Sequence, residues 1–159
     1  SEQNPFLLEK IQTYKEFASF DMNDIYGEEN LQDAFKLTTH SFKSIYLENN
    51  GNGSFTVKQL PNEAQMGPTL SLITGDFDND GNIDIMGIGA IYDAEVETIR
   101  YDSNFGYVLL GNGKGEFRYA KQYDPFIDSD AKDIEQVVIN GKKQFVVVSN
   151  NEPLQMFSY

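Results

Sequence analysis

Four aspartates share one short stretch of the chain, residues 75–84, which reads G-D-F-D-N-D-G-N-I-D. They fall at loop positions 1, 3, 5 and 9: Asp76, Asp78, Asp80 and Asp84. Gly81 stands at position 6, where the backbone must reverse sharply. Hard cations such as Ca²⁺ take about six to eight oxygen ligands, mostly carboxylates plus a backbone carbonyl. Carboxylates on alternate residues of a curled loop can converge on one point, and the Asn82 carbonyl at position 7 can complete the set, so we interpret the stretch as a Ca²⁺ loop.

Three other interpretations of this loop are an EF-hand, a turn without metal and a catalytic carboxylate pair. An EF-hand needs a bidentate Glu at position 12 and helical flanks, but Gly87 stands there, and residues 69–74 alternate as a strand does. A turn without metal is the plainest alternative, because Asp, Asn and Gly dominate turns. A catalytic pair would need two carboxylates in different environments, which this spacing does not indicate. The Ca²⁺ loop explains four aspartates in this register best.

The composition limits the protein class to which this loop belongs. The chain has 159 residues, of which 40% are hydrophobic, and this suits a globular domain with a real core. The net charge is −13, and the twelve basic residues are scattered, which argues against nucleic acid as a partner. Absence of cysteine excludes disulfides and thiolate chemistry. The sequence contains no run of about 18 apolar residues, so no membrane-spanning segment is predicted.

The N-terminal part, residues 1–38, is predicted to be helical and to pack on the sheet that follows. Asn4 and Pro5 suit the start of a helix. One buried stripe is predicted at helical spacing, formed by Leu7, Ile11, Tyr14 and Ala18. A capped turn over residues 21–27 leads to a second predicted helix over residues 28–37, with Leu31, Ala34 and Phe35 on one side.

Residues 39–159 change to short apolar runs separated by Gly/Asn turns, which is typical of antiparallel strands. Residues 50–55 read N-G-N-G-S-F and residues 112–117 read N-G-K-G-E-F, an offset of 62 (112 minus 50). Such a repeat indicates an array of similar β units. Two strands are predicted within residues 41–60, four within 69–123 and three within 132–159. The run Val146–Val148 suggests a strand buried on both faces.

Four-stranded antiparallel units repeated radially form a β-propeller. The predicted fold class is therefore mainly β: a partial β-propeller with one full and two partial blades, preceded by a helical segment. Because such a section leaves strand edges unpaired, self-association through open sheet edges is expected.

The motifs G-D-F-D-N-D-G-N-I-D-I-M and G-Y-V-L-L-G-N-G-K-G-E-F resemble the FG-GAP/VCBS repeat of extracellular β-propellers, the blade type also found in integrin α subunits. More narrowly, the chain resembles the C-terminal part of large secreted FG-GAP repeat-containing proteins of Bacteroidetes. The resemblance implies an extracellular, Ca²⁺-binding blade. It carries the metal-ligand role over to Asp76, Asp78, Asp80, Asn82 (by its carbonyl) and Asp84. The chain departs from a full propeller because the metal motif occurs only once.

Other candidate chemistry is sparse. A second acidic stretch lies between two predicted strands and is either a second cation site or a solvated loop with a Glu97–Arg100 ion pair: Asp93, Glu95, Glu97 and Asp102. A further group of aspartates is predicted to be a linker between blades: Asp124, Asp128, Asp130 and Asp133. His40 is the only histidine, and no catalytic triad or other catalytic residue is predicted.

Three function classes follow from these observations. The favoured one is a non-enzymatic, Ca²⁺-stabilised extracellular module that binds a protein or glycan or serves as a scaffold. The second is an accessory or catalytic part of a carbohydrate-active enzyme, which would need a concave site with carboxylates of unequal pKa. The third is a self-assembling interaction module. Fold alone cannot choose among them.

Overall fold

The computed structural model describes residues 5–158 and divides the chain into two compact units, Ser1–Ser41 and Phe42–Tyr159. The division falls a few residues after the boundary at 38 that the sequence predicts. Packing of the helical part on the sheet stays a prediction. Within the described residues, no helix is long and apolar enough to cross a bilayer.

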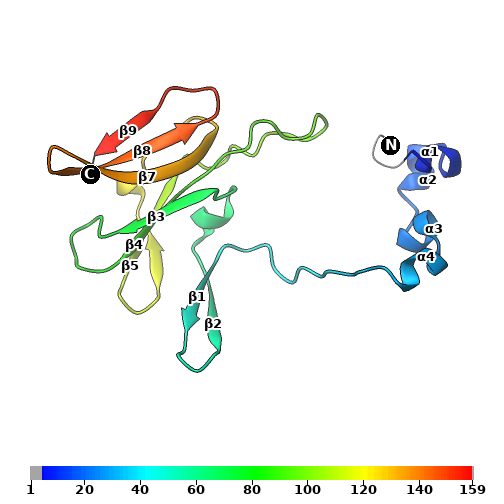
Figure 1. Ribbon diagram of the computed structural model, residues 1–159, viewed down its shortest axis with the longest axis horizontal. Coiled ribbons are helices and arrows are strands. Elements are labelled where there is room, and N and C mark those ends of the chain that lie inside the picture. Colours follow the sequence, from blue (N-terminus) through cyan, green and yellow to red (C-terminus); the bar gives the residue numbers. More distant parts are fainter. Residues whose placement is uncertain (1–4, 159) are drawn as a thin grey trace. The chain divides into compact units, whose positions relative to one another are not determined.

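From residue 5 onward, the first unit contains four short helices (Figure 1): α1 (Leu7–Lys10), α2 (Tyr14–Phe17), α3 (Met22–Tyr26) and α4 (Glu28–Gln32). The predicted stripe on a single helix is wrong, since the chain is extended at Ile11 and Tyr14 is 94% exposed. Thr13 starts a new helix instead, because its hydroxyl accepts from the Glu16 N–H and the Glu16 carboxylate accepts from the Thr13 N–H. Asn4 lies outside the described residues.

The other long predicted helix, over residues 28–37, is also shorter than expected. α4 ends at Gln32, and Phe35 beyond it is 88% exposed. The turn predicted at 21–27 is the capped helix α3, whose N-cap Asp21 accepts from two backbone N–H groups and which ends at Gly27 with φ +82°. Side-chain capping therefore sets the starts of α2 and α3, whereas α1 and α4 begin without a side-chain cap.

Up to residue 158, the second unit contains nine strands in three antiparallel sheets (Figure 1). The two-stranded sheet contains β1 (Ile45–Asn49) and β2 (Phe55–Gln59). The four-stranded sheet contains β3 (Ser71–Gly75), β4 (Asp84–Ile88), β5 (Tyr107–Gly111) and β6 (Phe117–Tyr119). The three-stranded sheet contains β7 (Ala131–Ile139), β8 (Lys142–Ser149) and β9 (Gln155–Ser158). The predicted mainly β class and the predicted two, four and three strands are confirmed.

The main hydrophobic core lies between the four-stranded and the three-stranded sheet. Met86, Ile88, Val108 and Leu110 of the four-stranded sheet share this cluster with Ile134, Phe145 and Val147. Phe77, just after β3, meets Phe145 edge to face with 5.7 Å between ring centroids. The two sheets are therefore stacked layers that bury one face each.

The opposite face of the four-stranded sheet packs against the segment that contains the two-stranded sheet. Its buried residues Tyr107 and Leu109 form a second cluster with Ala64 of the 3₁₀ helix η1 (Asn62–Gln65). Tyr46 of β1 meets Phe117 of β6 at 5.4 Å, and the Lys58 ammonium donates to the Lys114 carbonyl at 3.2 Å. The two-stranded sheet thus contacts the four-stranded sheet at β6 and at the β5–β6 turn.

The prediction that β8 is buried on both faces is wrong. Val147 is fully buried in the core, whereas Val148 is 45% exposed. The apolar run therefore has one face in the core and one face uncovered, because the three-stranded sheet has a layer on one side only within the described residues.

Candidate functional site

The acidic loop connects β3 to β4, at the end of the sheet where β5 passes into β6. Asn79 and Gly81 both have left-handed backbone conformations, with φ +62° and +85°. Gly81 thus lies at the reversal that the sequence predicts, where a residue with a side chain would be strained. The two reversals curl the chain so that carboxylates far apart in an extended strand face one another.

Three carboxylates converge in this loop. Asp76, Asp78 and Asp84 each offer an oxygen, and these three atoms lie within 4.8 Å of one another. Ionised carboxylates this close repel one another, and water screens this repulsion in part because Asp76 and Asp78 are only half-buried. The donor set is all oxygen, which is the set that a hard divalent cation prefers. It is the one such group among residues 5–158.

Asp84 ties the loop to the sheet. Its side chain is fully buried, and its two oxygens accept from the Phe77 N–H at 2.7 Å and the Gly111 N–H at 2.9 Å. Each carboxylate oxygen has two lone pairs, so both oxygens keep capacity for a further partner. One residue therefore joins the loop, the start of β4 and the end of β5.

Asp80 and Asn82 lie differently from the predicted ligand arrangement. The Asp80 carboxylate is not in the three-carboxylate group; it accepts from the Asn82 N–H at 2.8 Å and from the Asn82 amide at 3.0 Å. These hydrogen bonds, the side-chain one first, hold the pKa of Asp80 below its ordinary value. Asp76 in turn accepts from the N–H groups of Asp80 and Gly81, both at 3.0 Å. A ligand role for Asp80 and the Asn82 carbonyl stays a prediction.

The β5–β6 hairpin approaches the acidic loop so closely that two of its positions need glycine. A Cβ on Gly111 would lie 2.2 Å from the Ile83 carbonyl oxygen, and one on Gly113 would lie 2.5 Å from the Asn82 side-chain oxygen. Both distances are shorter than real Cβ contacts allow. The repeated N-G-x-G hairpin and the acidic loop therefore form one structural unit.

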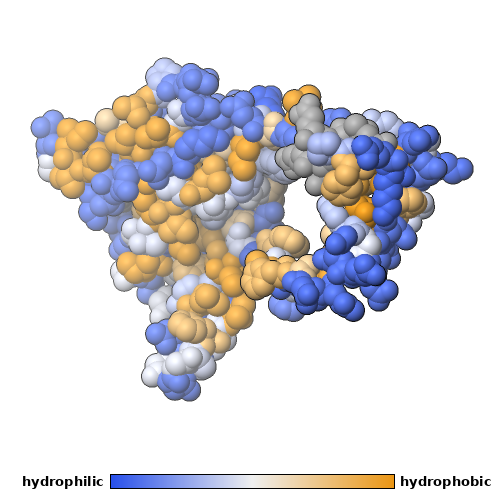
Figure 2. Space-filling view, turned by 45° about the vertical axis from the view of Figure 1, so that its right-hand side comes forward, coloured by the Kyte–Doolittle hydropathy of each residue, from blue (hydrophilic) through white to orange (hydrophobic). Residues whose placement is uncertain are grey.

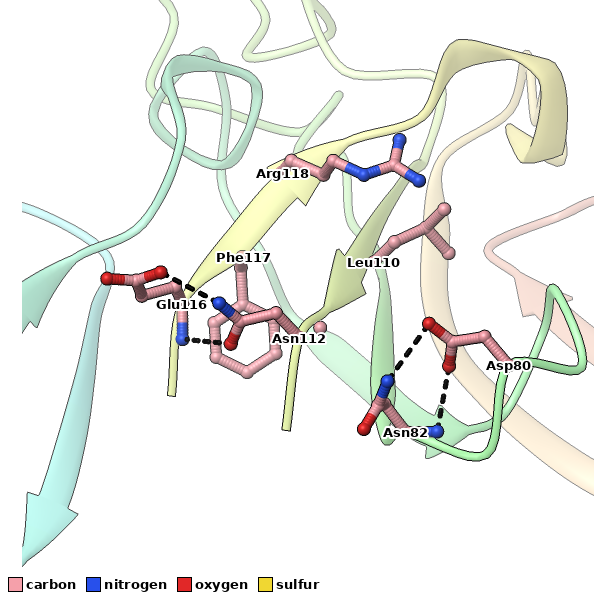
Figure 3. Close-up of a pocket in the computed structure, with 8 residues that line it drawn as sticks. Asp80, Asn82, Leu110, Asn112, Glu116, Phe117 and Arg118 are labelled. Atoms are coloured by element: carbon pink, nitrogen blue, oxygen red, sulfur yellow. Dashed lines mark hydrogen bonds between the residues drawn. The ribbon is translucent and has the colours of Figure 1, made fainter. Parts of the chain in front are cut away.

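A pocket of about 420 Å³ opens between this hairpin and the loop (Figure 3). Its lining residues are Asp80, Asn82, Leu110, Gly111, Asn112, Glu116, Phe117 and Arg118. Figure 3 shows the Arg118 side chain extending from β6 across β5, toward the side on which Asp80 lies. Asn112 donates to the Glu116 carboxylate at 2.7 Å. The sequence reasoning missed this pocket, although the repeated hairpin marks one wall of it.

The second acidic stretch does not form a comparable group. Among the described residues, Asp93, Glu95, Glu97 and Asp102 do not contribute three carboxylates to any common point. The predicted Glu97–Arg100 pair is wrong: Arg100 lies 3.6 Å from the Asp102 carboxylate and over the Tyr92 ring, 4.5 Å from its centroid. This stretch is a surface excursion closed by a bridge between Ile91 and Tyr101.

The aspartates predicted to be a linker have specific partners. Asp130 is buried and lies 2.6 Å from the Lys132 ammonium, while its carboxylate also accepts from the Tyr92 N–H. Asp124 accepts from the Tyr119 hydroxyl, and this bond raises the pKa of Tyr119 to about 12. Desolvation raises the pKa of Asp124. The segment between the two larger sheets is thus held by polar contacts that its composition does not reveal.

No protein-family model, curated protein or solved structure matches this chain.

Proposed function

We propose that the β3–β4 loop binds Ca²⁺ and that the ion stabilises an extracellular binding or scaffold module. Asp76, Asp78 and Asp84 would hold the ion. The observation that carries the proposal is the convergence of their oxygens within 4.8 Å around a loop whose last carboxylate is fully buried. A bound divalent cation would remove the mutual repulsion of these groups. It would also join β4 and β5 through Asp84.

The resemblance to FG-GAP/VCBS blades supports this proposal from the sequence side, and with it a secreted location. The motif joins two neighbouring strands of a complete antiparallel four-stranded sheet, as a blade of that family requires. The stacking of the three-stranded sheet on one face of this sheet is consistent with a neighbouring blade.

The pocket beside the loop is the proposed ligand site of this module. It combines amide, carboxylate and guanidinium groups with the ring of Phe117, which suits a hydroxyl-rich ligand such as a glycan. Arg118 takes part in none of the ion pairs found within residues 5–158, and its charge contributes to the lowered pKa of Asp80 across the pocket. Hydrogen bonds from Asn82 lower the pKa of Asp80, so Asp80 itself does not suit the role of general acid in a glycosidase.

Thermal unfolding with Ca²⁺ or with a chelator tests the proposed metal site. A ligand at about 100 times its Kd adds about 2.7 kcal/mol to the free energy of unfolding. For a unit of about 120 residues, this raises the Tm by about 10 °C. We expect that rise in the wild type, its loss with chelator, and its absence in Asp78→Asn.

Glu97→Gln is the matched control, because it removes one negative charge from the exposed second acidic stretch. This variant should keep the whole Ca²⁺-dependent rise. Equal Tm values for the wild type in Ca²⁺ and in chelator would refute the proposal, as would a full rise in Asp78→Asn. A rise with Mg²⁺ equal to that with Ca²⁺ would contradict the choice of ion, since Mg²⁺ demands a smaller octahedral site.

A further inference from the structure

The pocket between the acidic loop and the β5–β6 hairpin lies on one face of the four-stranded sheet. Leu110 and Arg118 are partners across β5 and β6, and the side chains of such a pair leave the sheet on the same face. Leu110 is 3% exposed and belongs to the main hydrophobic core, so this is the face that packs against the three-stranded sheet. The pocket therefore has an apolar floor at the rim of the core, with the Arg118 guanidinium beside it.

Two carboxylates line the pocket, and an asparagine orients each of them. Asp80 accepts from the Asn82 N–H at 2.8 Å and from the Asn82 amide at 3.0 Å. Glu116 accepts from the Asn112 amide at 2.7 Å. Both carboxylates keep lone pairs for a further partner, because an ionised carboxylate has about four acceptor positions. The walls of the pocket thus present two fixed hydrogen-bond acceptors.

Arg118 is the cationic residue of the lining. Among residues 5–158 it forms no ion pair with Asp80 or Glu116, so these opposite charges face the opening without direct contact. In the view of Figure 3, the Leu110 side chain lies between the Arg118 guanidinium and the Asp80 carboxylate. A ligand above Leu110 can therefore accept from the guanidinium and donate to the carboxylate.

This set of groups selects the chemistry of the ligand. A hydroxyl both donates and accepts a hydrogen bond, so two neighbouring hydroxyls satisfy a guanidinium and a carboxylate together. An anionic ligand would meet Arg118, but it would also meet two fixed negative charges beside the converging carboxylates of the loop. An ammonium group would meet the charge of Arg118. A neutral pair of hydroxyls avoids both conflicts.

The exposed apolar surface of the same unit offers no such recognition. Figure 2 shows hydrophobic residues along the β1–β2 hairpin, the lowest part of the view, above its hydrophilic tip. The exposed side chains of this hairpin, among them Leu47, Phe55 and Val57, do not line the pocket. Binding in the pocket should therefore depend on its polar groups and not on these side chains.

We propose that the pocket binds a neutral sugar through two adjacent hydroxyl groups, one held by Arg118 and the other by Asp80, with the C–H surface of the sugar ring on Leu110. This inference rests on the proposed ligand site and names the chemical class of its ligand. The volume of about 420 Å³ falls within the range of small-molecule sites, about 300–1,000 Å³. The net charge of −13 also opposes the approach of a polyanionic glycan.

Native gel electrophoresis of the complete chain tests the proposal, with Ca²⁺ in every buffer and dextran, galactomannan or xyloglucan dissolved in the gel. We expect at least one of these neutral polysaccharides to retard the wild type. Arg118→Gln should bind the same polysaccharide about tenfold more weakly, because it loses a charged hydrogen-bond donor. Periodate cleaves the bond between two hydroxyl-bearing carbons, so periodate treatment followed by borohydride reduction of the polysaccharide should abolish the retardation.

Arg100→Gln is the matched control, since Arg100 is the other arginine of the chain and lies outside the pocket, beside Asp102. This variant and Val57→Ser should bind as the wild type does. The rise in Tm with Ca²⁺ is measured separately on each variant, and Arg118→Gln should keep it, which also shows that this variant folds.

A wild type that none of the three neutral polysaccharides retards would overturn the inference, and the rise in Tm with Ca²⁺ would still decide the fate of the ion site. Equal retardation of the wild type and Arg118→Gln would overturn it too, as would full retardation by the oxidised polysaccharide. Retardation by polygalacturonate alone, lost in Arg118→Gln, would replace the neutral sugar with an anionic one and leave the pocket as the ligand site.

Discussion

Replacing Asp84 with Asn should destabilise the second unit even when no divalent ion is present. The buried carboxylate accepts one backbone N–H on each oxygen, from Phe77 at 2.7 Å and from Gly111 at 2.9 Å. Asparagine has nearly the same shape but only one acceptor oxygen. Its amide would therefore point a donor at one of these N–H groups, which would be left buried without a partner.

The expected loss follows from the burial of these groups. A buried donor left unsatisfied costs about 1–3 kcal/mol, and bonds to a charged acceptor lie toward the upper end. In a unit of about 120 residues, each kcal/mol lowers the Tm by about 4 °C. Asp84→Asn in chelator should therefore unfold about 4–12 °C below the wild type, as followed by circular dichroism.

Asp78→Asn separates this structural role from ion binding. Asp78 accepts one hydrogen bond, from the Asp80 N–H at 3.1 Å, and it lies in a group of like charges. Its replacement in chelator should change the free energy of unfolding by less than about 0.5 kcal/mol. The structural role of Asp84 is refuted if Asp84→Asn unfolds at the wild-type temperature in chelator. It is also refuted if Asp84→Asn and Asp78→Asn show the same loss of stability in chelator.

Two further predictions concern the neighbouring contacts. Gly111→Ala should cost more stability than Gly51→Ala in urea unfolding, although only Gly51 has positive φ: a Cβ at 111 would meet the Ile83 carbonyl, whereas at 51 it meets open space. We expect the free energy of unfolding to fall by about 1–3 kcal/mol for Gly111→Ala and by about 1 kcal/mol for Gly51→Ala. A larger loss for Gly51→Ala would contradict the close approach of Gly111 to Ile83. The Tyr119 hydroxyl donates to the Asp124 carboxylate, and this bond raises the pKa of Tyr119 to about 12. The folded state therefore holds the Tyr119 proton more tightly than the unfolded chain does. This contribution to the free energy of unfolding is lost as the pH rises from about 10 to about 12. Tyr119→Phe should remove a tyrosinate absorbance step near pH 12, and a missing step nearer pH 10 would show that the hydroxyl is free.

Local patterns predicted the strands and the loop well, because their signals lie within a few consecutive residues. The N-G-x-G turns, the alternation of apolar residues and the aspartate spacing each depend on neighbouring positions. The structure confirms three sheets of two, four and three strands. The prediction of a single helical stripe was wrong because Thr13 and Asp21 each cap the start of a new short helix. The spacing of apolar residues alone does not show these helix starts.

The sequence by itself determined the mainly β class and the strand count of each sheet, and it marked the acidic loop with five candidate metal ligands: Asp76, Asp78, Asp80, Asn82 and Asp84. Tertiary structure alone decided that Asp84 is buried between two backbone N–H groups and that Gly111 lies against Ile83. Turns are formed by residues next to one another in the chain, so the sequence itself indicates them. Burial and close approach join residues tens of positions apart, and they arise only when the sheets are stacked.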